Sequence, residues 1–135
     1  MSTSQSPCPD CGRNANLTVG QTMLEAGVAW HRAWSCPHCG LQIEEDGWET
    51  PEPIRQALFD AEGRWTLQLE GDSPAAESLK VIRDVLDLSM DDIKRIRDDP
   101  SRPLYTGTRT EVAWLHGRLT AAGLQAISQK GDITD

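Results

Sequence analysis

Two short stretches of the sequence share one pattern: Cys8-Pro9-Asp10-Cys11-Gly12 and Cys36-Pro37-His38-Cys39-Gly40. Each Cys-x-x-Cys turn directs two sulfurs toward one point, and the glycine that follows lets the chain turn back without a Cβ clash. Two such turns provide four soft ligands, a set that favours tetrahedral Zn²⁺ and leaves no open position for a catalytic water. The alternatives, disulfides or a redox pair, are disfavoured in a reducing compartment and by the matched pairing. The spacing therefore predicts one structural zinc ion bound by Cys8, Cys11, Cys36 and Cys39.

The repeated Cys-Pro-x-Cys-Gly pattern resembles the zinc-ribbon knuckles of many unrelated proteins. Applied to residues 1–47, the resemblance implies a metal-held β-hairpin plus a third strand. Side chains alternate as in strands over residues 17–24, 28–35 and 41–44. A unit this small buries too little apolar surface to offset the chain entropy, so metal binding should supply most of its folding free energy.

A connecting helix is expected over residues 48–63, with Thr50 as its cap, Pro51 in its first position and Gly63 at its end. Residues 64–129 then predict a small α+β domain of order β-α-α-α-β. Its predicted elements are a strand at 65–69, a break at 71–74, helices at 75–87, 90–99 and 109–122, a loop at 99–107 and a closing strand at 124–128. Residues 130–135 are expected to be a disordered tail. The fold class is α+β: a zinc ribbon of short antiparallel strands, then a small sheet with helices packed on one face.

Capping boxes mark two of these helices. Ser89 with Asp92, and Thr108 with Glu111, place a hydroxyl and a carboxylate three residues apart before an apolar run. We therefore expect helices to begin after Ser89 and after Thr108.

Three stretches of this second unit resemble the C-terminal domain of the bacterial ribosomal stalk protein. They are Val81-Ile82-Arg83-Asp84-Val85, Leu88-Ser89-Met90-Asp91-Asp92-Ile93-Lys94 and Leu115-His116-Gly117-Arg118-Leu119-Thr120-Ala121-Ala122-Gly123-Leu124. The resemblance implies a compact sheet with helices on one face that docks translation factors, and a related fold serves as a substrate adaptor for Clp proteases. Residues 85–93 also resemble the opening of a repressor-type helix-turn-helix, as in zinc-ribbon antitoxins. The prolines and paired acids of residues 98–103 disfavour a groove-reading helix.

The chain is acidic, with 21 Asp and Glu against 13 Lys and Arg and a net charge of −8. Residues 41–99 carry 16 of the acidic and only 7 of the basic residues. Phosphate backbones and anionic lipids repel such a chain, so neither nucleic acid nor a membrane is an expected partner. Residues 1–6 lack the features of a signal peptide, and a soluble, cytoplasmic protein is expected. The acidic stretch is either a solvated face or a surface that steers a cationic protein partner.

No catalytic motif is present, since the sequence lacks a phosphate-binding loop, a His-Glu-x-x-His pair and a nucleophile elbow. His31, His38 and His116 are expected to be structural. The tryptophans Trp30, Trp34 and Trp48 fill the ribbon core or form an aromatic anchor beside Glu44, Glu45 and Asp46. We expect a non-catalytic immunity or antitoxin-type inhibitor that binds a basic toxin, with a translation- or proteolysis-linked adaptor as the alternative and a DNA-binding regulator as the weaker one. These six residues are the candidate contacts: Trp30, Trp34, Trp48, Glu44, Glu45 and Asp46.

Overall fold

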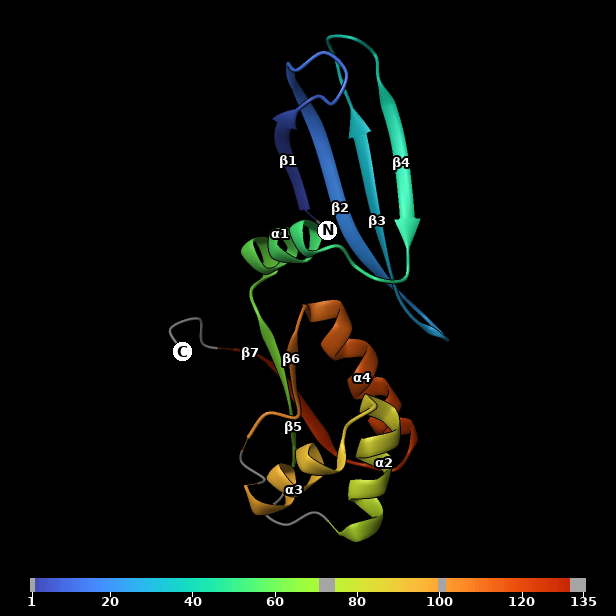
Figure 1. Cartoon of the computed structure of the whole chain (residues 1–135), viewed down its shortest axis with the longest axis vertical. Helices are drawn as coiled ribbons and strands as arrows, with labels where there is room; N and C mark the ends of the chain where they lie inside the picture. The colour runs from blue at the N-terminus through green and yellow to red at the C-terminus, as the bar shows by residue number, and fades with distance from the viewer. Residues whose placement is uncertain (1, 71–74, 100–101, 132–135) are drawn as a thin grey trace. The chain divides into compact units, whose positions relative to one another are not determined.

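The computed structural model describes residues 2–70, 75–99 and 102–131 and divides into two compact units, Met1–Glu62 and Gly63–Asp135. The first unit carries a four-stranded antiparallel sheet and one helix, and the second carries three helices and a three-stranded sheet (Figure 1). The expected α+β class is confirmed. The strand break expected at 71–74 and residues 132–135 of the expected tail lie outside the described residues. Within those residues, no helix combines the length and apolar character of a membrane span.

The first sheet has the order β1-β2-β3-β4, with every neighbouring pair antiparallel. Its strands are β1 (Ser2–Pro7), β2 (Asn14–Leu24), β3 (Gly27–Ser35) and β4 (Gln42–Gly47). Strand β1 is an addition to the three strands that the sequence predicts. It consists of Ser-Thr-Ser-Gln-Ser-Pro and pairs along β2 from Ser2↔Val19 to Pro7↔Asn14. Such an edge strand is held by backbone hydrogen bonds, so hydrophobic alternation does not reveal it.

Alternation along the strands gives this sheet two different faces. One face carries Leu17 and Val19 of β2 opposite Trp34 and Arg32 of β3. Helix α1 (Glu52–Glu62) belongs to this first unit, because its buried Ile54 and Leu58 pack with Val19, Leu17 and Trp30. The opposite face carries mainly small and polar side chains, with Leu24 at the hairpin tip.

The start of α1 differs from the expected cap. The helix begins at Glu52, and the carbonyl of Pro51 accepts hydrogen bonds from the N–H groups of Ile54 and Arg55. Pro51 therefore holds the position before the helix instead of its first position. The Thr50 hydroxyl accepts a hydrogen bond of 3.0 Å from the Gln21 amide of β2 and so links the helix start to the sheet.

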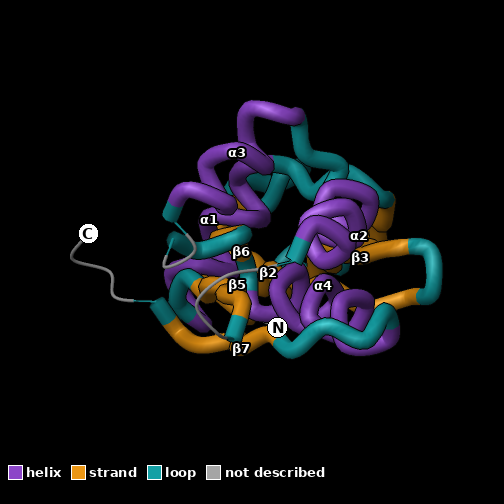
Figure 2. The backbone as a smooth tube through the Cα atoms, turned by 90° about the horizontal axis from the view of Figure 1, so that it is seen from below, coloured by secondary structure: helices purple, strands orange, loops and turns teal. Residues whose placement is uncertain are grey.

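The second unit has the element order β-α-α-β-α-β. Its sheet, of order β6-β5-β7, is antiparallel; α2 and α4 lie on one side of it in Figures 1 and 2, and α3 adds Ile93 and Ile96 to the same core. The elements are β5 (Trp65–Leu69), α2 (Ala76–Leu86), α3 (Met90–Asp98), β6 (Tyr105–Gly107), α4 (Arg109–Ala121) and β7 (Ala126–Lys130). The predicted loop at 99–107 is wrong at its end, because Tyr105–Gly107 pairs with β5. The Leu124 N–H donates to Leu119 at the end of α4, so the closing strand begins two residues later than predicted.

One hydrophobic core supports this second unit. Its sheet contributes Leu67, and its other buried members are Ile82, Ile93, Ile96, Leu104, Val112, Leu115 and Leu119. Both predicted capping boxes are confirmed, at Ser89 with Asp92 and at Thr108 with Glu111. Alternate residues of β5 point into this core, which is why the strand shows a period of two.

Candidate metal centre

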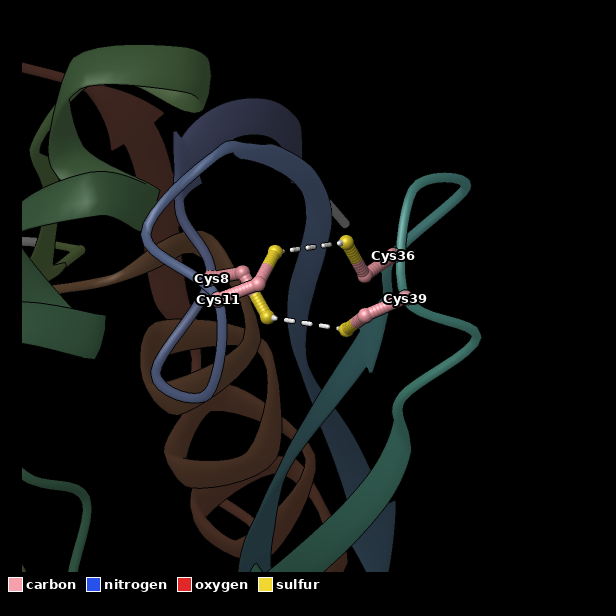
Figure 3. A group of neighbouring side chains, drawn as sticks. All are labelled: Cys8, Cys11, Cys36 and Cys39. Carbon is pink, nitrogen blue, oxygen red and sulfur yellow. Dashed lines mark hydrogen bonds between the residues drawn. The ribbon is translucent and has the colours of Figure 1, made fainter.

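The four cysteine sulfurs converge at one end of the first sheet. All four Sγ atoms lie within 4.8 Å of one another, and Figure 3 shows the two pairs pointing toward a common centre. The Cys8–Cys39 and Cys11–Cys36 Sγ distances are both 3.7 Å. A tetrahedral site with metal–sulfur bonds of about 2.3 Å has edges of about 3.8 Å. The spacing therefore fits a single four-coordinate ion bound by all four cysteines.

The two knuckles have the same backbone hydrogen bonds. In each, the first cysteine N–H donates to the carbonyl five residues later, and its own carbonyl accepts from the glycine N–H four residues later. These bonds are Cys8 N to Arg13 O at 2.7 Å, Gly12 N to Cys8 O at 2.9 Å, Cys36 N to Leu41 O at 2.9 Å and Gly40 N to Cys36 O at 2.9 Å. Gly12 and Gly40 have φ of +77° and +80°, in the left-handed region. The expected need for glycine after each pair is confirmed.

Each knuckle buries its first cysteine and exposes its second. Cys8 and Cys36 are 3% exposed and pack with Ala15, Trp34 and Leu41, whereas Cys11 and Cys39 face solvent. Solvent therefore reaches the cluster from the side of Cys11 and Cys39.

Backbone N–H groups and neighbouring sulfurs set the acidity of the thiols. The Cys39 N–H lowers the pKa of Cys36 to about 6, with a smaller lowering from the His38 N–H. At Cys39 the Leu41 N–H acts to lower the pKa, but burial and three neighbouring sulfurs together raise it to about 12. Like charges cannot accumulate at one point without a cation, so an ion bound here must displace protons from the cluster. Four thiolates form a soft donor set that fits Zn²⁺, and four protein ligands fill a tetrahedral coordination shell.

The histidines lie outside this centre. His38 is exposed within the second knuckle, and His31 lies over Gly20 of the neighbouring strand, where an added Cβ would be 2.5 Å from its ring. The His116 Nε2 is 2.9 Å from the carbonyl oxygen of Ala126, which links α4 to β7. Both half-buried rings therefore have the packing expected of structural side chains.

The six candidate contact residues are divided between two faces of the first sheet. Trp30 and Trp34 share one face: Trp30 packs toward α1, and Trp34 packs against the buried cysteines. On that same face Glu45 pairs with Arg32 at 2.7 Å. Two further carboxylates, Glu44 and Asp46, belong to the opposite face, as the register requires.

Trp48 differs from the other two tryptophans because it is 58% exposed. Sequence reasoning missed two further exposed apolar residues, Met23 at 53% and Leu24 at 46%. They are the last two residues of β2, directly before the turn to β3. The sequence signal for them is the length of the two predicted strands that form this hairpin. The strands β2 and β3 are longer than β1 and β4, so the residues at the hairpin tip have no neighbouring strand to cover them.

No family model, curated protein or solved structure matches the chain. The fold and the cysteine cluster therefore define its class on their own. The chain is a two-unit α+β protein with a zinc-ribbon-like site on its N-terminal antiparallel sheet.

Proposed function

We propose that this chain is a non-catalytic binding protein that captures a protein partner with a basic surface, and that the partner is a toxin which it inhibits as an immunity protein or antitoxin. The exposed Trp48 carries the proposal. It lies two residues after the acidic run Glu44, Glu45 and Asp46, just past Gly47 at the end of β4. Large aromatic side chains dominate binding at interfaces, and surrounding charges of one sign steer an oppositely charged partner toward them.

The charge distribution supports this proposal. Residues 1–62 contain nine acidic and three basic residues, a balance of −6, while residues 63–135 contain twelve and ten, a balance of −2. The charge per residue is therefore much higher in the unit that carries Trp48. Long-range attraction from such a surface raises the association rate with a cationic protein and weakens as salt is added.

Zinc has a supporting role in the proposal. We assign Zn²⁺ to Cys8, Cys11, Cys36 and Cys39 in a reducing cytoplasm, where the thiols stay free of disulfides. The ion ties the β1–β2 connection to the β3–β4 connection. It thereby holds β4 in register, and a preorganised surface loses less entropy on binding.

The test is recovery of the protein from its native host with its bound proteins, identified by mass spectrometry. The proposal expects a basic protein that arrests growth when expressed alone and is neutralised by co-expression of this chain. The triple variant Glu44→Gln, Glu45→Gln, Asp46→Asn should slow capture and reduce its salt dependence. Recovery of a translation factor or a protease in place of a toxin would refute the inhibitor role.

The adaptor role is the second candidate, and it rests on the second unit. The second unit packs three helices and a small sheet around one core, and the stalk-domain resemblance implies a compact sheet with helices on one face. Binding of an elongation factor or a Clp component would favour this role. A DNA-binding regulator has less support, because α3 is followed by the strand β6 instead of a recognition helix.

A further inference from the structure

The β2–β3 hairpin extends past the ends of the neighbouring strands β1 and β4. Its pairing continues to Leu24↔Gly27, whereas β4 ends at the pair Trp30↔Gly47 and β1 begins at Ser2↔Val19. Residues 22–29 therefore form a two-stranded arm, visible in Figure 1 as the blue extension past β4. An isolated two-stranded ribbon is marginally stable in water, so this arm depends on the side chains packed against it.

A groove of about 340 Å³ lies along this arm. Register places Thr22, Leu24, Ala29, His31 and Asp46 on one face of the sheet, and the groove is lined by these residues together with Trp30, Gly47 and Trp48. The Trp48 indole lies close to the backbone of β3, since a Cβ added at Gly27 would be 3.9 Å from its Cζ3 atom. Leu24 and Trp48 thus form apolar walls around a floor that the small Ala29 leaves open.

The charges at this groove have one sign. Among the described residues that line it, Asp46 is the only carboxylate, none is Lys or Arg, and His31 is the one other titratable group. The nearest basic side chain on β3, Arg32, belongs to the opposite face and pairs there with Glu45. A neighbouring hollow lined by Ala33, Trp34, Ser35, Gln42 and Glu44 adds a second carboxylate two residues along β4. On one strand face this spacing is about 6.5–7 Å, which equals the repeat of alternate side chains in an extended peptide.

We propose that this groove and the neighbouring hollow bind an extended basic segment of the partner. One Arg or Lys side chain lies with its stem against Leu24 and its cation over the Trp48 ring, beside the Asp46 carboxylate. The cationic side chain two residues along the segment pairs with Glu44. An aromatic face and a carboxylate together select a cation with an apolar stem. The inference rests on the proposed function, because it states how the basic partner is recognised.

The experiment uses the full-length, zinc-loaded protein and the peptide acetyl-Arg-Ser-Arg-Ser-amide, with citrulline replacing arginine in the control peptide. Binding is followed by amide and indole NMR shifts at millimolar peptide. We expect saturable shifts at Trp48, Ala29 and Leu24 with the arginine peptide and none with the citrulline peptide. Trp48→Ala should weaken binding about tenfold, the loss expected for one cation–π contact together with its apolar burial. Met23→Ala, whose side chain belongs to the other face of the arm, is the matched control and should bind as the native protein does.

A comparison of the adjacent carboxylates Glu45 and Asp46 distinguishes binding at a specific site from general electrostatic attraction. Asp46→Asn removes a charge at the groove, and Glu45→Gln removes an equal charge on the opposite face. The proposal expects Asp46→Asn to weaken binding severalfold and Glu45→Gln to change it little. Equal effects, binding of the citrulline peptide or absence of shifts would overturn it. Partner capture that persists unchanged in Trp48→Ala and Asp46→Asn would refute the groove while leaving the inhibitor role intact.

Discussion

The two units of this chain reach a folded state by different means. Apart from Phe59, the buried apolar residues of the first unit form two small clusters, and two of the three buried members of one cluster are the cysteines Cys8 and Cys36. The second unit instead has one core of eight buried side chains contributed by its helices, sheet and loops. We therefore expect the first unit to depend on a bound ion and the second on packing, so that each responds to a perturbation that leaves the other unchanged.

Metal removal should produce the largest difference between the units. Because thiolate–metal bonds replace a hydrophobic core in the first unit, chelation of the ion or Cys36→Ser should unfold residues 2–62 and leave residues 63–131 folded. Native mass spectrometry should find one zinc per native chain and none in the variant. Amide NMR should show the second unit's resonances unchanged and those of the first collapsed into the range of unfolded peptides.

Ser35→Ala is the matched control for the cysteine variant, since Ser35 is exposed and directly precedes the knuckle. It should keep the zinc and the native spectrum. If the first unit stays folded without metal, the proposed difference between the units is wrong, because its few buried apolar residues are then sufficient to stabilise its fold.

Leu119→Ala should destabilise the second unit and leave the first unit unchanged, the reverse of metal removal. Leu119 is fully buried in the core of the second unit, and cavities of this kind lower the free energy of unfolding by about 2–5 kcal/mol. Chemical denaturation should report this loss, with zinc content unchanged. Ile127→Ala, at a side chain that is 45% exposed on β7, should change stability by about 0.5 kcal/mol or less. Loss of zinc from Leu119→Ala would mean that the units do not fold independently.

The sequence predicted the parts of the fold that depend on local chemistry. Cysteine spacing predicted the cluster of four sulfurs, and hydroxyl–carboxylate pairs predicted the starts of α3 and α4. It did not reveal β1 or β6, because these strands are defined by backbone pairing with β2 and β5, and backbone pairing does not depend on a hydrophobic pattern in the strand itself. Such pairing leaves no pattern in a run such as Ser-Thr-Ser-Gln-Ser-Pro.

The candidate contacts were grouped by position in the sequence, and the structure separates them. Glu44, Glu45 and Asp46 are consecutive, so a strand must place the middle residue on the face opposite the other two. Alternation alone would have predicted this separation. The apolar walls of the groove could not be predicted in this way, because Leu24 and Trp48 come together only through the register of three strands.

Two glycine substitutions should have effects of opposite sign in the two units. Gly40→Ala places a Cβ at φ +80°, with no atom within 4 Å of it, so backbone strain alone should destabilise the first unit by about 1–2 kcal/mol and weaken zinc binding. Gly117→Ala, in the middle of α4 with equally open surroundings, should stabilise the second unit by about 0.5–1 kcal/mol. Thermal melts with zinc present measure both effects. If both variants are destabilised, backbone conformation does not explain the difference that we expect between Gly40 and Gly117.

The smallest expected effect separates the units by pH. The Ser89 hydroxyl and the Ser89 backbone N–H both donate to Asp92, with a further contribution from the charge of Arg95, and they lower the pKa of the carboxyl below 3.8. A carboxyl whose pKa is lowered by folding stabilises the folded state above its unfolded pKa, and this contribution is lost as the pH falls through the folded pKa. The second unit should therefore lose a small part of its stability only below about pH 4.

The first unit should unfold at a higher pH, because protons compete with the metal for the thiolates. Ser89→Ala should return the Asp92 pKa toward 3.8, as measured by carboxyl NMR titration, and Asp92→Asn should flatten the acid limb of helix stability measured by circular dichroism. An unchanged Asp92 titration in Ser89→Ala would show that the capping box is not the source of the shift.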